Sequence, residues 1–289
     1  MSFFNSYWSN RIILKYKDKG LIGVIKSIFN FLNKTLNHKH TGEFPLKHYF
    51  IKKRKLIKKF TKENLDQLDD IDIVNIGNYL LKKSFLSKET VIYSFGIGEN
   101  LSFEKTISRL YGCKVYCFDP TTLAINFMKK EDYDKENIFF EPCGIWISDG
   151  KIKFYNQNEN DLKNTGGSIT NLFETNNYML LDCNKLSTLM RKNNHENIDV
   201  IKLDIEGACI EVMKDFLKEN IFPDQIVAEF EYSEHDNISE EDFNLWSEDV
   251  KKIISILKNK GYKCYNLPRY SHLPYSTIEV LFVNYNFSK

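Results

Sequence analysis

The chain has 289 residues, of which 42% are hydrophobic and 27% charged. This composition excludes an intrinsically disordered protein, and the length suits one large domain or one domain with an appendage. The six cysteines form no CxxC pair and have no histidine at zinc-ligand spacing, which argues against a disulfide framework or structural zinc site and favours the reduced thiols of a cytoplasmic protein.

The N-terminal part of the chain is strongly basic, although the net charge is only +1. Residues 1–60 carry 14 Lys and Arg against 2 Asp and Glu, whereas the remainder carries 26 against 37. Apolar residues at helical spacing between Leu21 and Leu32, and a second basic segment over Tyr49–Phe60, predict a basic helical extension over residues 1–64.

Two functions of this extension stay open. Residues 1–60 either contact an anionic membrane surface, or pack on the body of the chain or on a second subunit in an oligomer. No nucleic-acid partner is expected, because no binding motif accompanies the charge. No apolar run reaches the roughly 20 residues of a membrane span, and no signal peptide is recognisable, so we expect a cytoplasmic protein, with attachment to the inner membrane face as an alternative.

The rest of the chain predicts an α/β domain with a mostly parallel sheet covered by helices on both faces. A helical pattern over Leu65–Phe85 precedes it, and a hairpin is expected from Ile145–Ser148 and Lys151–Tyr155, turning at Asp149-Gly150. The other expected strands are Val91–Phe95, Lys114–Phe118, Ile138–Glu141, Met179–Asp182, Val200–Leu203, Gln225–Tyr232, Tyr262–Leu267 and Ile278–Asn284. The expected helices are Ser102–Tyr111, Thr122–Lys130, Lys185–Arg191, Ala208–Lys218 and Glu240–Lys260.

A Gly-x-Gly turn follows the first of these strands, at Gly96 and Gly98. Glycines there permit a sharp turn and a close approach of ligand to backbone. Asp119 ends the next strand, where a carboxylate can accept hydrogen bonds from a ribose diol. The alternatives are a purely structural turn and a helix N-cap.

Acidic residues end two later strands. Asp204 and Glu206 follow Val200–Leu203, and Glu229 lies near the end of the next strand. They are candidates for a general base, a cation site or the partner of an ammonium group. One hypothesis is that Asp204, Glu229 and Glu231 bind Mg²⁺. The alternatives are that these acids are solvated at the strand ends and that Glu206 caps the following helix. No metal ligand is assigned.

The segment Lys202–Ala208 reads KLDIEGA and resembles the KLDIEGAE motif of FkbM-type S-adenosylmethionine (SAM)-dependent methyltransferases, with Cys209 in place of the final acid. Tyr93–Ile97, Ser102–Glu104 and Phe118–Thr121 resemble a neighbouring methyltransferase-like family. The resemblance covers roughly residues 88–235. It implies a Rossmann-like class I methyltransferase domain over residues 65–289, with a C-terminal antiparallel strand and SAM as cofactor.

The resemblance also implies residue roles. Ser94, Gly96 and Gly98 would lie under the methionine moiety, Asp119 would hold the ribose, and Asp204 would sit beside the methyl-transfer site. Pro120 and Thr121 would border the ribose pocket, and the adenine wall would be Cys143, Gly144 and Ile145. Ser94 replaces the acid that usually opens the motif and Asn100 the usual third glycine, so the partner of the SAM amino group stays open among Glu99, Glu104 and Asp204.

The resulting hypothesis is a SAM-dependent O-methyltransferase of glycan biosynthesis that acts on a sugar, sugar nucleotide or glycan-like small molecule. Its candidate catalytic residues are Asp204, Glu229 and Glu206. One alternative is an NAD-dependent Rossmann oxidoreductase, since the glycine turn and Asp119 would also suit NAD. Another is a non-catalytic SAM-binding or scaffold protein at the membrane surface.

Overall fold

The computed structural model describes residues 45–156, 167–171, 175–231, 240–267 and 277–286. The chain divides into two compact units, residues 1–49 and 50–289, and the features below belong to the second unit unless stated. The predicted extension covers residues 1–64, and its stretch 1–60 is expected to contact a membrane, the body of the chain or a second subunit. Residues 1–44 of this extension lie outside the described residues. Helix α2 spans Pro45–Asn64, where the second basic helix is predicted. None of the helices described has both the length and the apolar content to cross a membrane.

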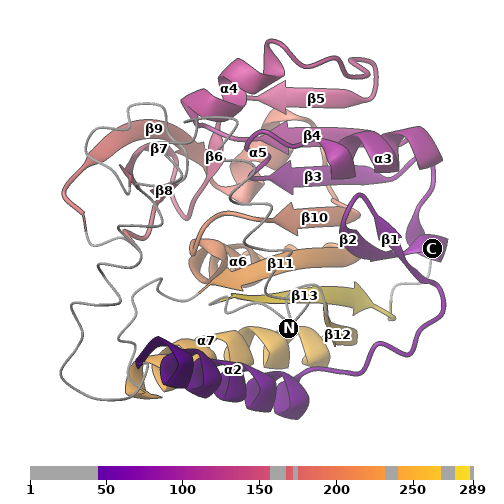
Figure 1. Cartoon of the computed structure of the whole chain (residues 1–289). Helices are drawn as coiled ribbons and strands as arrows, with labels where there is room; N and C mark the ends of the chain where they lie inside the picture. The colour runs from indigo at the N-terminus through magenta and orange to yellow at the C-terminus, as the bar shows by residue number, and fades with distance from the viewer. Residues whose placement is uncertain (1–44, 157–166, 172–174, 232–239, 268–276, 287–289) are drawn as a thin grey trace, which may run out of the picture. The chain divides into compact units, whose positions relative to one another are not determined.

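Seven of the described strands form the central sheet, in the order β12-β13-β11-β10-β3-β4-β5 (Figure 1). Neighbouring strands from β5 to β11 are parallel, whereas β13 pairs antiparallel with both β11 and β12. This confirms the predicted Rossmann-like sheet and its C-terminal antiparallel strand. The strands are β3 Val91–Phe95, β4 Lys114–Phe118, β5 Ile138–Glu141, β10 Val200–Leu203, β11 Gln225–Glu231, β12 Tyr262–Asn266 and β13 Thr277–Asn284.

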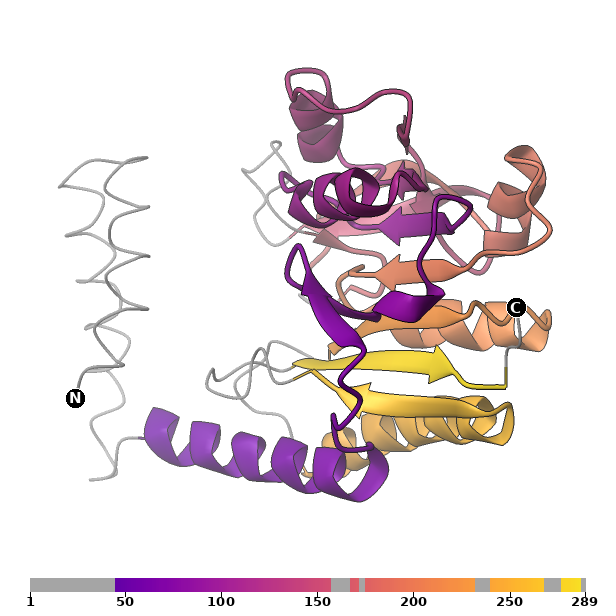
Figure 2. The same cartoon turned by 90° about the vertical axis from the view of Figure 1, so that its right-hand side faces the viewer.

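Two hydrophobic cores lie on opposite faces of this sheet. Figure 2 shows helices on both sides of the sheet. Side chains alternate along a strand, so Ile92 of β3 enters one core while Tyr93 and Phe95 enter the other. Helices α3 Ser102–Tyr111 and α4 Thr122–Met128 cover the first face. The second is covered by α5 Leu186–Lys192, α6 Cys209–Lys218 and α7 Glu240–Asn259, with Phe60 of α2 against Trp246 of α7.

The helix expected over Leu65–Phe85 is wrong, because this segment forms a β-hairpin. Strands β1 Ile73–Ile76 and β2 Tyr79–Lys82 pair antiparallel and lead into the short 3-10 helix η1 Lys83–Phe85. Gly77 and Asn78 have φ of 52° and 81°, so both turn residues are left-handed. Such a two-residue turn suits a tight hairpin and interrupts any helix. The hairpin packs on the α3 and α4 face through Ile76 and Leu81.

A second sheet of four described strands has the order β6-β9-β7-β8. Its strands are β6 Gly144–Ile145, β7 Gly150–Asn156, β8 Gly167–Ser168 and β9 Tyr178–Asn184. The hairpin predicted across Asp149-Gly150 is also wrong, since β9 lies between β6 and β7 and pairs with both. Asp149 instead accepts hydrogen bonds from the Lys185 N–H at 2.9 Å and the Thr188 hydroxyl at 2.9 Å, which fixes the start of α5.

Candidate functional site

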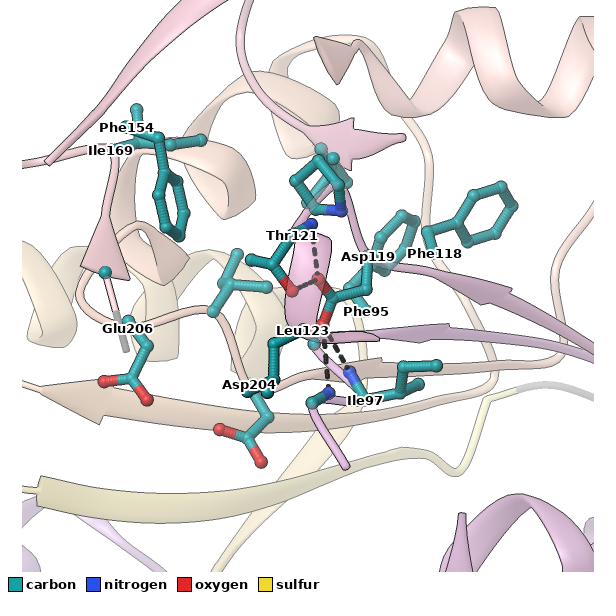
Figure 3. A pocket seen from close by; sticks show the side chains of 17 residues that line it. Phe95, Ile97, Phe118, Asp119, Thr121, Leu123, Phe154, Ile169, Asp204 and Glu206 are labelled. Atoms are coloured by element: carbon teal, nitrogen blue, oxygen red, sulfur yellow. Dashed lines mark hydrogen bonds between the residues drawn. The ribbon is translucent and has the colours of Figure 1, made fainter. Parts of the chain in front are cut away.

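A pocket of about 260 Å³ lies at the carboxyl ends of β3, β4 and β10 (Figure 3). From β3 the sheet continues to β4 on one side and to β10 on the other, so the strand order reverses here. Open α/β sheets bind their ligands at such a point. The second sheet adds a further wall through Phe154, Gly167 and Ile169.

The loop after β3 contains two left-handed glycines, Gly96 at φ 74° and Gly98 at φ 52°. A Cβ on Gly96 would lie 1.7 Å from the carbonyl oxygen of Asp204, so no side chain fits at this position. A Cβ on Gly98 would meet no atom within 4 Å. Gly96 thus lets the ends of β3 and β10 touch, whereas Gly98 presents bare backbone to the pocket.

Asp119 follows β4 and is only 5% exposed. Its Oδ2 accepts hydrogen bonds from the N–H groups of Ile97 at 3.1 Å and Gly98 at 3.0 Å (Figure 3). Its Oδ1 accepts from the Thr121 N–H at 2.9 Å and the Thr121 hydroxyl at 2.6 Å. A carboxylate has about four lone-pair sites, so the protein already uses all of them. Asp119 therefore fixes the glycine loop, and a ligand hydroxyl would have to share its oxygens.

Asp204 lines the pocket from the end of β10 and is held by a residue of β2 and a residue of β10 itself. The Tyr79 hydroxyl of β2 donates to Asp204 Oδ2 at 2.8 Å. Lys202 Nζ lies 4.0 Å from the same oxygen and donates to the Gly96 carbonyl at 2.8 Å. Asp204 is thereby connected to the glycine loop through Lys202.

Glu229 lies beside Asp204 on the neighbouring strand, opposite Glu279 in the β11–β13 register. Burial raises the pKa of Glu229 well above its ordinary value of 4.5. The charges of Asp204, Glu231 and Glu279, and a hydrogen bond with Asp204, raise it further. Glu229 therefore holds a proton near neutral pH and serves as a hydrogen-bond donor to Asp204.

Behind the glycine loop, Ser94, Glu104 and Lys202 form a buried polar group. The Ser94 hydroxyl donates to Glu104 Oε1 at 2.6 Å, and Lys202 Nζ lies 3.9 Å from that oxygen. Burying an isolated charge is costly, so the ammonium and carboxylate groups offset one another. The Ser94 side chain therefore contacts Glu104 behind the pocket wall and does not line the pocket.

Glu206 lies at the pocket rim with an exposed side chain and a left-handed backbone, at φ 46°. The buried Ser168 of β8 donates a hydrogen bond to the Glu206 carbonyl. The second sheet is thereby joined to the turn after β10. Figure 3 shows Phe154 and Ile169 together on one side of the pocket and the carboxylates of Asp204 and Glu206 on another.

Most of the residues predicted from the sequence come together in this pocket, although their roles stay predictions. Those that line it are Gly96, Gly98, Asp119, Pro120, Thr121, Gly144, Ile145, Asp204 and Glu206. Four others lie outside the lining. Ser94 and Cys143 are buried behind it, Glu99 is exposed, and Glu229 lies behind Asp204.

Sequence reasoning missed the contributions of Tyr79, Phe154 and Ile169. Tyr79 contacts Asp204 across a separation of 125 residues, and its segment is predicted as helix. The Gly77-Asn78 pair is a hairpin signal that would have placed Tyr79 on a strand. Phe154 and Ile169 lie near no motif. Within the described residues, no group of three or more His, Cys, Asp or Glu side chains is arranged to hold a metal ion.

The family model "Methyltransferase FkbM domain" matches residues 77–264, which is more than half of the chain. The chain belongs to the FkbM methyltransferase family. The predicted resemblance is thus confirmed, and the FkbM protein is a SAM-dependent methyltransferase, so the NAD-dependent alternative is not retained.

No curated protein matches this FkbM chain. Similar solved structures include an rRNA methylase from Streptococcus thermophilus (10% identity, 70% of this chain and 90% of that chain, TM-score 0.35). Another is the fibrillarin pre-rRNA processing protein of Methanococcus jannaschii (13% identity, 75% of this chain and 84% of that chain, TM-score 0.39). A third is a precorrin-6y C5,15-methyltransferase from Geobacter metallireducens (8% identity, 76% of this chain and 94% of that chain, TM-score 0.34). Similarities this low carry no argument about function.

The pocket residues fit the cofactor of the FkbM family. Gly98 offers backbone beside open space, and Asp119 and Asp204 place carboxyl groups at the ends of β4 and β10. Carboxyl groups can hold ribose hydroxyls and ammonium groups, and Leu123 and Ile145 supply apolar surface for a base.

Proposed function

We propose that this methyltransferase transfers a methyl group to a hydroxyl of a sugar, sugar nucleotide or glycan-like small molecule. The observation that carries the proposal is the Asp204 carboxylate, which lines the pocket while a second carboxyl group behind it keeps its proton. A hydroxyl must lose its proton to the enzyme or to water when its oxygen is methylated. A pocket with an ionised acid suits that demand.

A polyhydroxylated acceptor also suits the rest of the pocket. Asp204 and Glu206 both offer oxygens that accept hydrogen bonds from hydroxyl groups. Phe154 and Ile169 offer apolar surface to the carbon-bound faces of such a molecule. The pairing of a few polar groups with an apolar wall is typical of small-molecule sites.

The chain's residues divide the work of the reaction. Bound SAM supplies an electrophilic methyl group on a sulfonium. Asp119 and the glycine loop would hold the cofactor, so that the acceptor oxygen could be aligned with the methyl group. Asp204 would accept the proton of the acceptor hydroxyl as the new oxygen–carbon bond forms and the methyl–sulfur bond breaks, with the sulfur leaving as the neutral thioether of S-adenosylhomocysteine. Glu229 would donate its hydrogen bond to Asp204.

Cofactor binding is tested by calorimetric titration with SAM. We expect micromolar binding by the wild type and at least about tenfold weaker binding by Asp119→Ala, which corresponds to about 1.4 kcal/mol. The variant loses both the predicted ribose acceptor and the bonds that hold Ile97 and Gly98. Thermal unfolding of both proteins separates a local effect from lost folding. Unchanged affinity in Asp119→Ala would contradict the placement of SAM in this pocket.

The acceptor class is tested with radiolabelled SAM and a panel of sugars, sugar nucleotides and glycan fragments. We expect transfer to at least one member, with turnover reduced about a hundredfold or more in Asp204→Asn. The asparagine keeps the size of the side chain but accepts no proton. Intact SAM binding without transfer to any member would refute the acceptor class, and full turnover in Asp204→Asn would refute the role of Asp204.

A further inference from the structure

We propose that Tyr79 is a positioning residue of the methyl-transfer site, whose hydroxyl holds the Asp204 carboxylate in its reactive orientation. The β1–β2 hairpin, which precedes the sheet in sequence, is then part of the active site. The inference rests on the proposed function only in taking Asp204 as the carboxylate that faces the reactants.

The hairpin has a fixed position against the body of the domain. A Cβ on Gly77 would lie 2.3 Å from the Cα of Phe103 and 2.5 Å from the carbonyl oxygen of Ser102. The turn is therefore in direct backbone contact with the first turn of α3. Tyr79 comes two residues later, at the start of β2, so this contact sets where its side chain begins.

The ring of Tyr79 is held without help from its hydroxyl. It packs edge-on against Phe103, with ring centroids 5.2 Å apart and an interplanar angle of 74°. Lys202 Nζ lies 5.1 Å from the ring centroid, in a cation–π arrangement. Phenylalanine would keep both contacts, so ring packing alone does not explain a tyrosine here.

The hydroxyl group makes the contact that bears on the chemistry. It donates to Asp204 Oδ2 at 2.8 Å, a hydrogen bond to a group that lines the pocket. Hydrogen bonds to an ionised acceptor are stronger than neutral ones and favour the ionised form. Tyr79 thus limits the rotation of the carboxylate and stabilises its charge.

The charged and titratable groups around Asp204 come from several elements. Lys202 lies 4.0 Å away on the same strand, Glu229 forms a hydrogen bond from β11, and the Cys209 thiol of α6 lies within electrostatic range. Lys202 also contacts the Gly96 carbonyl, so its position is shared with the glycine loop. Tyr79 reaches Asp204 from the hairpin side, where replacing its hydroxyl with hydrogen removes the hydrogen bond to Asp204 Oδ2.

The test compares SAM affinity in the full-length wild type and Tyr79→Phe at one pH near neutrality. SAM is a cation at its sulfonium and attracted by an ionised Asp204. We expect Tyr79→Phe to bind SAM about tenfold more weakly near neutral pH.

Tyr265→Phe is the matched control, because it too removes one tyrosine hydroxyl hydrogen bond. Tyr265 is fully buried, and its hydroxyl pairs with that of Tyr285 at 2.9 Å, outside the pocket lining. We expect its SAM affinity to stay within about twofold of the wild type. Wild-type affinity in Tyr79→Phe would overturn the proposal.

A double variant separates positioning from general packing. Introducing Tyr79→Phe into Asp204→Ala should change SAM affinity by less than about twofold, because the partner of the hydroxyl is gone. An equal loss in both backgrounds would mean that Tyr79 acts through packing alone, and would overturn the proposal. SAM affinity is measured without an acceptor. If no sugar of the panel is methylated, the proposed acceptor class is refuted, but the test of Tyr79 is unaffected.

Discussion

Glu229 and Asp204 are neighbouring carboxyl groups on adjacent strands, and they have different surroundings. Asp204 borders the pocket and accepts a hydrogen bond from Tyr79. Glu229 is enclosed among Asp204, Glu231 and Glu279, and its pKa is raised by burial and by their charges. The pair resembles other enzyme sites in which two acids are given different protonation states by their environments.

We expect Glu229→Gln to become more stable relative to the wild type as pH rises. The raised pKa means that folded protein binds this proton more tightly than unfolded protein does, so the free energy of unfolding of the wild type falls above about pH 4.5. The free energy of unfolding of the wild type falls by at most about 1.4 kcal/mol per pH unit. Glutamine keeps a hydrogen-bond donor and has no proton to lose.

Urea unfolding of the two proteins at a series of pH values measures this difference. Glu248→Gln is the matched control, because Glu248 is an exposed residue of α7 that pairs with Lys251. For this control we expect a difference that hardly changes with pH. A flat difference for Glu229→Gln as well would contradict the assigned protonation state.

At this scale, sequence reasoning located residues better than it located their partners. Asp119 and Asp204 are recognised from their places after apolar strands, and both line the pocket. The partners of Asp204 were not predicted, because Tyr79 contacts it only after the hairpin has folded onto the domain. Asp119 was predicted to hold a ligand, yet its four hydrogen bonds within the protein depend on loop geometry that no spacing rule contains.

Among the secondary-structure elements, the β1–β2 hairpin shows why periodicity alone is insufficient. Its apolar residues, Ile73, Val74, Ile76 and Leu80 among them, fit a helix wheel as well as a pair of short strands. The Gly77-Asn78 turn decides between them. The predicted β6–β7 hairpin failed for a related reason, since β9, distant in sequence, pairs with both strands. The long alternation of strands and helices that forms the central sheet was predicted correctly.

We expect Gly77→Ala to destabilise the domain more than Gly98→Ala does. Both glycines have φ of 52°, so alanine carries a similar conformational cost of about 1–2 kcal/mol at either position. At Gly77 the new Cβ would also collide with the backbone of Phe103, whereas at Gly98 it would enter open space.

Thermal unfolding and SAM titration of the two variants separate these effects. Gly77→Ala should have the lower midpoint, with each additional 1 kcal/mol worth about 2–4 °C in a domain of this size. Gly98→Ala should lose more SAM affinity than stability, because its Cβ enters the pocket. Equal midpoints would contradict the close contact between the hairpin turn and α3.

At the scale of the whole molecule, all six cysteines lie within the described part of the chain, and all six are buried. Burial raises the pKa of their thiols, to about 11 for Cys113 and Cys143. The thiolate is the reactive form, so native protein should react slowly with thiol reagents and all six thiols should react on unfolding. The rate of labelling then reports opening of the domain.

We expect SAM to slow this labelling in the wild type by a factor that rises with its concentration, since a ligand that binds only the folded state stabilises it. In Asp119→Ala the same SAM concentration should slow labelling less. Timed reaction with a chromogenic disulfide measures both. A thiol that reacts at once in the native wild type would contradict the burial of the six cysteines.

Asp119 also has a consequence for the kinetics of ligand entry. Its four hydrogen bonds, all from groups of the protein, fix the glycine loop and the start of α4. The entropy of ordering this loop is therefore lost during folding, before an encounter with the cofactor. Association should then proceed at the rate typical of a rigid site, and substitutions around the loop should change residence time far more than they change the rate of arrival.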